Sequence, residues 1–294
     1  MADDAGETQL LRAIDSLPTL PVVALQIGEV VHSRSASVQQ VAELLRSDPA
    51  TSAKLLRLVN SPYFGIPGGV ADVARAIPFV GFSTLYQLVL SISVLETLGI
   101  GPGGHDPRLL WTHSLTVATA ARELAEEIRF SDPGACFTAG LLHDMGEIAL
   151  AKLSPDKVAA AFETMRAEGV AIDVAERRHG LAPHDRIGSR LARQWKFPVT
   201  LATPIEQHHA IHRVEVRERL ASHLRTLTEI IAAADHLSRA CQASSSDPFG
   251  EDGEPDVAEL FARNGLSLAQ RDTLCDRTRA KLERSRIFLS LVGG

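Results

Sequence analysis

Residues 139–146 read Ala-Gly-Leu-Leu-His-Asp-Met-Gly and place an imidazole and a carboxylate side by side at the end of an apolar turn. A charged aspartate is rarely buried without a partner. The dipeptide His143-Asp144 is therefore either a hydrogen-bonded part of the core or part of a ligand site. This stretch alone supports the two interpretations equally, so the surrounding sequence is needed to choose between them.

Helical periodicity surrounds this stretch on both sides. Ser37 and Gln40 form a capping-box pattern, and Asp48-Pro49 is typical of an N-cap followed by proline at the first helical position. No run of alternating β-branched residues lies between turn signals, so the sequence predicts an all-α fold. The spacing of apolar residues predicts helices at 10–16, 21–32, 50–59, 70–79, 83–98, 107–129, 133–150, 155–168, 172–179, 183–195, 201–209 and 220–240.

The segment Gly99-Ile-Gly-Pro-Gly-Gly104 interrupts the helical pattern most strongly. It separates an N-terminal helical subdomain, about 10–100, from a second helical part, about 106–240, and we expect the two to form one domain over 10–240. Residues 241–255 are polar and acidic, which predicts a mobile loop. Helical spacing returns after this loop and predicts a C-terminal helical segment over 256–294.

Composition excludes several classes of protein. The chain has 294 residues, with 30 Lys and Arg against 36 Asp and Glu, so its net charge is −6 and nucleic-acid binding is not expected. Three widely spaced cysteines, Cys136, Cys241 and Cys275, are typical of cytosolic thiols and not of a disulfide framework or zinc site. No apolar signal core follows the N-terminus, and the most apolar stretch, 85–98, is too short to cross a bilayer. The sequence predicts a cytoplasmic protein without a membrane partner.

Eleven histidines are the unusual feature of the composition. Five of them, with two aspartates, fall on or at the ends of apolar faces of different predicted helices: His113, His143, Asp144, His184, His208, His209 and Asp235. Each residue alone is weak evidence, and His113 or His184 alone is explained more simply as a hydrogen-bonded core group. Their conjunction favours a shared divalent metal, because imidazole and carboxylate suit Fe or Mn, with Zn and Ni as further candidates.

The order of these residues resembles the HD superfamily of metal-dependent phosphohydrolases, whose HD-GYP branch has the most similar catalytic pattern. The N-terminal half resembles the HDOD family more specifically. The matching segments are Leu-Pro-Thr-Leu-Pro at 17–21, Asp-Pro at 48–49, Lys-Leu-Leu-Arg-Leu-Val-Asn-Ser at 54–61, Phe-Gly at 64–65 and Ala-Ile at 76–77, with Trp195, Pro198 and His208-His209 later. The resemblance covers about 10–240 and implies an HD-like helical core with an additional N-terminal helical subdomain. It also implies a bacterial signalling module. HDOD proteins are generally regarded as such modules and usually lack demonstrated catalysis.

The chain keeps the full set of metal-binding residues but departs from the catalytic branch of the superfamily. Glu147 stands where HD-GYP enzymes have a lysine, and a carboxylate there would repel the phosphate that a lysine stabilises. Ala-Ile-His-Arg-Val at 210–214 follows the paired histidines, with no Gly-Tyr-Pro motif. Leu109 stands where some family members have a glutamate ligand.

Two functional hypotheses follow from this pattern. The first is a non-catalytic regulatory module that binds a signalling protein, or a ligand such as a nucleotide, and carries a His/Asp metal site. The alternative is a metal-dependent phosphohydrolase acting on a nucleotide or cyclic dinucleotide, with Asp144 or Asp235 orienting a metal-bound water. Candidate phosphate-binding cations are Lys152, Arg186 and Arg190, whose simpler interpretation is solvated charge on helix faces.

Overall fold

The computed structural model describes residues 12–31, 33, 36–62, 64–99, 107–241, 257–267 and 269–285. These residues contain helices and no strands, which confirms the predicted all-α fold. They divide into two compact units. The smaller unit holds the described residues of 18–99 with 280–285, and the larger holds those of 12–17 and 107–279. The predicted acidic loop falls outside the described residues except for Cys241.

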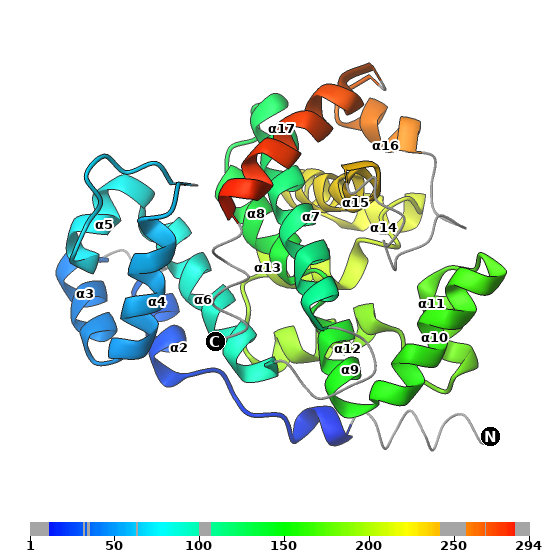
Figure 1. The fold of residues 1–294 in the computed structure, drawn as a ribbon, viewed down its shortest axis with the longest axis horizontal. Coiled ribbons are helices and arrows are strands. Elements are labelled where there is room, and N and C mark those ends of the chain that lie inside the picture. The colour runs from blue at the N-terminus through cyan, green and yellow to red at the C-terminus, as the bar shows by residue number, and fades with distance from the viewer. Residues whose placement is uncertain are drawn as a thin grey trace. The chain divides into compact units, whose positions relative to one another are not determined.

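The smaller unit is a group of helices built around one long apolar helix, α6. Its helices are α2 (Val22–Val31), α3 (Val38–Arg46), α4 (Pro49–Val59), α5 (Val73–Val80) and α6 (Phe82–Leu98) (Figure 1). Helix α6 packs against α2, α4 and α5 and buries residues around its whole circumference. The predicted caps are confirmed: Gln40 N donates to Ser37 Oγ at 3.2 Å and Thr51 N donates to Asp48 Oδ1 at 3.1 Å.

Among the described residues, no single helix has both the length and the apolar composition needed to cross a membrane. Helices α5 and α6 meet that test only when taken together, and they are bent by 117° relative to each other.

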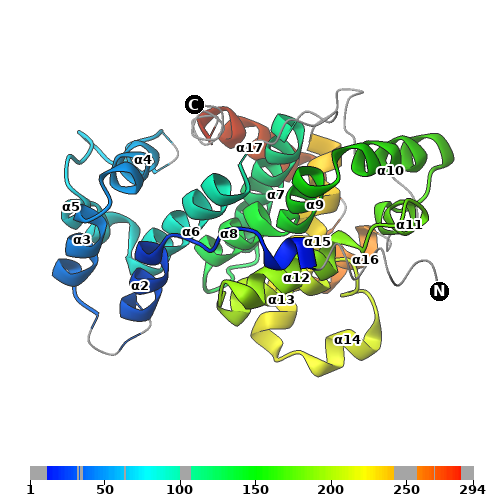
Figure 2. The ribbon, with the colours of Figure 1, turned by 90° about the horizontal axis from the view of Figure 1, so that it is seen from below.

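The larger unit contains the remaining helices. They are α7 (Pro107–Glu127), α8 (Pro133–Leu142), α9 (Met145–Leu153), α10 (Pro155–Glu168), α11 (Ile172–Arg178), α12 (His184–Gln194), α13 (Val199–Gln207), α14 (Val214–Arg219), α15 (Ser222–Cys241), α16 (Val257–Arg263) and the start of α17 (Ala269–Ser285). Helix α7 packs against α8 and α15, while α12 packs against α9 and α13 (Figures 1 and 2). All the predicted metal-binding residues belong to this unit.

The helix predicted over 133–150 is wrong in one respect, because it is broken in two at His143-Asp144. Helix α8 ends at Leu142, and the Nδ1–H of His143 donates to the carbonyl of Gly140 at 2.8 Å. Asp144 leaves the helical conformation, with φ −99° and ψ 22°, before α9 begins at Met145. The break lets two consecutive side chains reach the same interior point, which one continuous helix would not allow.

The sequence also missed α14. This short helix buries none of its residues, so it has no apolar periodicity that could reveal it.

The crossing of α9 and α12 depends on a missing side chain. A Cβ at Gly146 would lie 2.0 Å from the carbonyl oxygen of His184 and 2.5 Å from the backbone nitrogen of Gly188. Both atoms belong to the backbone, so no side-chain rotation could relieve the overlap. Glycine at 146 therefore lets the helix that begins with His184 lie directly against the His143-Asp144 break.

We expect Gly146→Ala to destabilise the protein by about 3 kcal/mol, because the two helices must separate to admit the methyl group. Urea unfolding measures this effect. Gly265→Ala is the matched control: Gly265 has φ +71° with nothing within 4 Å, so only about 1 kcal/mol of backbone strain is expected. Equal costs for the two variants would contradict the close-packing explanation.

Candidate metal centre

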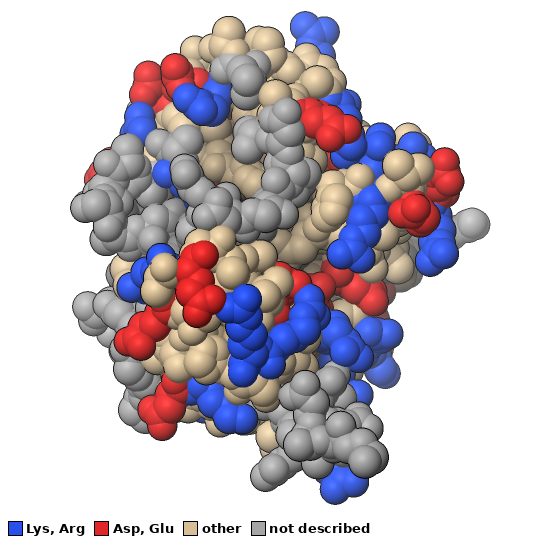
Figure 3. Space-filling view, turned by 90° about the vertical axis from the view of Figure 1, so that its right-hand side faces the viewer, with Lys and Arg blue, Asp and Glu red and all other residues tan. Residues whose placement is uncertain are grey.

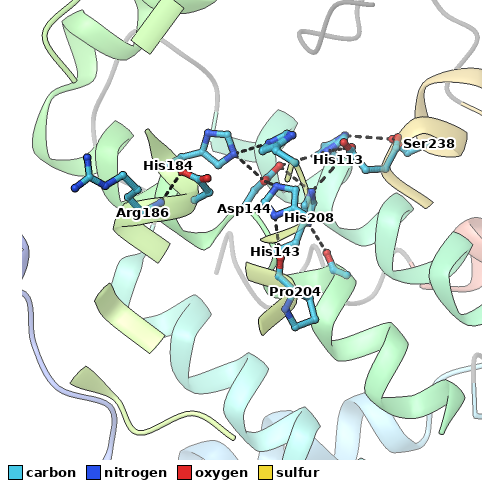
Figure 4. A network of polar contacts seen from close by, with 12 residues as sticks. His113, His143, Asp144, His184, Arg186, Pro204, His208 and Ser238 are labelled. Atoms are coloured by element: carbon cyan, nitrogen blue, oxygen red, sulfur yellow. Dashed lines mark hydrogen bonds and ion pairs between the residues drawn. The ribbon is translucent and has the colours of Figure 1, made fainter. Parts of the chain in front are cut away.

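The seven predicted metal-binding residues come together inside the larger unit. They arrive from five places in the fold: α7 (His113), the α8–α9 break (His143 and Asp144), the first residue of α12 (His184), the turn after α13 (His208 and His209) and α15 (Asp235). Six of them are buried and His209 is half-buried. Residues up to 122 positions apart in the sequence thus form one His/Asp cluster, drawn in Figure 4.

Asp144 lies at the middle of the His/Asp cluster. Its Oδ1 is 3.5 Å from Nε2 of His184 and 3.4 Å from Nε2 of His208. Its Oδ2 is 2.9 Å from Nε2 of His143 and 3.5 Å from Nε2 of His113. The two carboxylate oxygens therefore face two different pairs of histidines (Figure 4).

The cluster resolves into two groups of donor atoms, each with all members within 4.8 Å of one another. One group is Asp144, His184, His208 and His209, and the other is His113, His143 and Asp144. Asp235 stands beside the second group, with its Oδ1 3.0 Å from Nε2 of His113. Asp144 is the member that both groups share.

Hydrogen bonds to groups outside the cluster set the ring orientation of two of its histidines. The Nδ1–H of His143 donates to the Gly140 carbonyl, and the Nδ1–H of His208 donates to the Pro204 carbonyl at 3.0 Å. A carbonyl oxygen only accepts, so the proton of each neutral imidazole is on Nδ1 and the lone pair of Nε2 points toward Asp144. Metal-binding histidines are commonly oriented in this way.

His184 has a carboxylate as its outer partner. Its Nδ1 lies 3.1 Å from Oε1 of Glu176, and Glu176 Oε2 also accepts from the backbone nitrogen of His184 at 3.1 Å. Glu176 is buried on α11, although in the sequence it precedes Arg177-Arg178 and looks like part of a solvated charged run. Sequence reasoning missed it because its partner is eight residues away on another helix.

We expect Glu176→Gln to weaken metal binding by about 10- to 100-fold, because the amide no longer increases the basicity of the His184 ring. Competition with a chromophoric chelator measures the affinity. Asp173→Asn is the matched control on the same helix, since Asp173 pairs with the exposed Arg177 and not with the cluster. An unchanged affinity in Glu176→Gln would remove Glu176 from the site.

The electrostatics of the cluster follow from burial of opposite charges. Burial lowers the pKa of His113, but Asp144 and Asp235 raise it more, to about 10. Burial likewise opposes the shift in His184, whose pKa the Glu176 carboxylate holds well above its usual range. The pKa of Asp144 is well below its usual range, because the surrounding imidazoles outweigh the burial that would raise it.

These groups fit a bound cation. Nε2 of His143, Nε2 of His208 and Oδ1 of Asp144 are all buried and make no hydrogen bond. Imidazole lone pairs that face carboxylate oxygens need a positive charge between them, either protons on the rings or a metal ion. A donor set of imidazole nitrogens and carboxylate oxygens with outer hydrogen bonds is what a divalent transition metal requires.

Glu147 is a buried carboxyl group whose pKa responds to burial and to the histidines of the cluster. It is buried within α9, and neither carboxylate oxygen makes a hydrogen bond. Burial raises its pKa well above the usual range, which favours the neutral form of the side chain. A neutral Glu147 would repel phosphate less than a charged one, and the lysine of the catalytic branch is absent in either case.

A pocket of about 590 Å³ borders the cluster at His209. The α10–α11 loop, α11, the start of α12 and the turn after α13 form its walls. Arg177, Arg186 and Arg213 line it, together with Asp173 and Asp185. Of the three cations named from the sequence, only Arg186 is there: Arg190 pairs with Asp15, and Lys152 is not part of the lining.

Comparison with known proteins gives the family. The HDOD domain model matches residues 17–211, and the chain therefore belongs to the HDOD family. An uncharacterized protein of Treponema pallidum (strain Nichols) is 26% identical over 200 residues, which are 67% of this chain and 38% of that protein. This chain thus spans less than half the length of that relative.

Two solved structures share the fold. A proposed phosphohydrolase from Shewanella amazonensis SB2B is 25% identical, with 94% of this chain and 97% of that chain covered and a TM-score of 0.70. A proposed signal transduction protein from Marinobacter aquaeolei VT8 is 18% identical, with 100% and 66% covered and a TM-score of 0.75. The fold therefore occurs in chains described by either of the two functions that the sequence left open.

Proposed function

We propose that this chain is a regulatory HDOD module that holds a divalent metal in its His/Asp cluster and responds to a bound ligand or protein partner without catalysis. The observation that carries the proposal is the arrangement of histidine nitrogens around Asp144. His143 and His208 have their Nδ1 protons engaged by carbonyls, and their Nε2 atoms are directed at one shared carboxylate. A hydrogen-bonded polar core would instead pair donors with acceptors.

The metal would be held by the two donor groups that share Asp144, with Fe or Mn as the first candidates and Zn or Ni as further ones. A bound ion would balance the buried carboxylates and join three helices and two turns through one centre. Such an ion also polarises phosphoryl oxygens and activates water when substrate reaches it. The regulatory proposal assigns the ion only the structural role of balancing charge and joining these elements.

The chain lacks two phosphate-handling features of the catalytic branch, which supports a role without catalysis. The position after the His-Asp-x-Gly pattern holds the buried Glu147, and no Gly-Tyr-Pro motif follows His208-His209. A transition-state phosphate would find no lysine there to stabilise its charge.

The pocket beside His209 supplies a place for the signal. Within the described part of the chain Arg213 makes no ion pair, whereas Arg177 is paired with Asp173. Basic side chains gather beside a hollow that also contains acidic ones on the face shown in Figure 3. Guanidinium groups in a pocket of this volume suit an anionic ligand of nucleotide size.

The same pocket favours phosphohydrolase activity as a second candidate function. It reaches His209, which belongs to one of the two donor groups, so an anion bound by Arg186 and Arg213 would have access to the metal. This access is the specific observation in favour of the alternative.

Metal analysis of the purified protein tests the first proposal. We expect near-stoichiometric Fe, Mn, Zn or Ni by elemental mass spectrometry, and a lower metal content in His143→Ala and in Asp235→Ala. His223→Ala is the matched control, because the exposed His223 stacks on Phe130 and lies outside the cluster. No metal in the wild type, even after reloading with Fe or Mn, would show that the cluster is a polar core network.

A second experiment separates binding from catalysis. Metal-loaded protein is incubated with cyclic dinucleotides, (p)ppGpp and dNTPs, and products are followed by chromatography while calorimetry records binding. Binding without product, weakened in Arg213→Ala, supports the regulatory proposal. Turnover that is lost in His143→Ala would establish the phosphohydrolase instead.

A further inference from the structure

Two of the three cysteines meet where α15 packs near α17, in the C-terminal part of the larger unit. Cys241 is the last residue of α15 and Cys275 lies in α17, and their Sγ atoms are 2.6 Å apart. Both side chains are buried, and both are free thiols. Their 34-residue separation explains why spacing in the sequence did not predict the pair.

The contacts around the pair hold the two sulfurs together. On the inner face of α17, Leu274 and Thr278 are buried beside Cys275. Arg279 Nε donates to the carbonyl oxygen of Cys241 at 2.8 Å, which ties the end of α15 to the next turn of α17. The end of α15 is therefore tied to α17 one turn beyond Cys275, and the pair lies in a buried environment.

The environment also differentiates the two sulfurs chemically. The hydrogen bond from Cys241 lowers the pKa of Cys275 against the effect of burial, and Arg279 and Arg271 lower it further. The same hydrogen bond raises the pKa of Cys241. Cys275 is thus the sulfur with the greater thiolate character, and Cys241 donates a hydrogen bond to it.

We propose that Cys241 and Cys275 form an oxidative modification site, in which a hydroperoxide converts the two thiols into a reversible disulfide between α15 and α17. This inference does not depend on the proposed function, since neither sulfur belongs to the His/Asp cluster.

The chemistry balances with one hydroperoxide per pair. The Cys275 thiolate attacks a peroxide oxygen, the O–O bond breaks, and the sulfur becomes a sulfenic acid while one water (or alcohol) leaves after protonation. The Cys241 sulfur then displaces the sulfenic oxygen, which departs as water, and the S–S bond forms. The two thiols lose two electrons and two protons, and the peroxide is reduced.

Cys136 provides an internal comparison. It is buried on α8, burial raises its pKa, and it belongs to no thiol pair. A buried thiol of this kind is expected to resist oxidation, because thiolate character controls reactivity.

The experiment uses the full chain, treated with hydrogen peroxide, desalted, unfolded and labelled with a maleimide. We expect two of the three thiols to become unreactive, and non-reducing peptide mapping to find Cys241 linked to Cys275 within one chain. Dithiothreitol should restore all three thiols. In Cys136→Ser both remaining thiols should still be lost, whereas Cys241→Ser and Cys275→Ser should form no intramolecular link.

Oxidised wild type should also unfold at a higher temperature than reduced wild type, because the new link constrains the unfolded chain. This readout and the peptide map need no variant, so a misfolded mutant would not affect them. Retention of all three thiols at a peroxide excess, a link that includes Cys136, or links between chains only would each overturn the proposal.

Discussion

Asp144→Asn is expected to lower metal affinity by about 100-fold or more, although the amide has almost the same shape as the carboxylate. Asp144 is the only residue common to both donor groups, and its two oxygens face two separate pairs of histidines. Exchange of one carboxylate oxygen for an amide nitrogen removes the negative charge. It also places an N–H donor where a metal ion would need an acceptor. Both groups therefore lose their shared ligand in one step.

Variants of residues that belong to one group give the comparison. His209→Ala removes a member of the first group only, and His113→Ala removes a member of the second only. We expect each to retain part of the metal that Asp144→Asn loses, measured as metal per chain by elemental mass spectrometry. Circular dichroism checks that each variant is folded. Equal metal content in Asp144→Asn and in the wild type would show that Asp144 is not a ligand.

The fold could be predicted from the sequence because the signals that specify a helix lie within a few residues of one another. Caps such as Ser37 and Asp48 and the spacing of apolar residues are short-range signals, and the structure has those helices with those caps. The break at His143-Asp144 was missed for a different reason. Nothing in the apolar pattern changes there, and the helix ends because a side chain takes up a backbone carbonyl and Asp144 adopts another conformation.

The candidate site was predictable only to the extent that its residue types are unusual on apolar helix faces. His113 and Asp235 could be selected in that way, and the structure brings them within 3.0 Å of each other. Glu176 could not, because a glutamate beside two arginines looks solvated until the tertiary fold buries it against His184. The pairing of Cys241 with Cys275 was hidden for the same reason: it depends on how two helices pack.

Removal of the metal is expected to make stability fall as pH rises from about 6.5 to about 10, whereas the metal-loaded protein should keep its stability over this range. Without metal, the buried carboxylates hold the pKa of His113 near 10 and also raise those of His184 and His208. A histidine whose folded pKa is raised contributes stability that is complete below its ordinary pKa, 6.5, and disappears as pH passes the folded value. Glu147, whose pKa burial also raises, changes stability in the same direction.

For His113 alone the shift from 6.5 to about 10 corresponds to a loss on the order of 5 kcal/mol over the whole range, at about 1.4 kcal/mol per pKa unit. Urea unfolding of chelator-treated protein at pH 6, 7.5 and 9 measures it. A metal ion replaces these protons, so metal affinity rises with pH and the loaded protein keeps its stability over the same range. Asp144→Asn, which removes a carboxylate that raises the pKa of His113, should show a shallower decline without metal. A metal-free wild type that gained stability from pH 6 to 9 would mean that these histidines are neutral in the folded protein, and the charge balance argued for the cluster would be wrong.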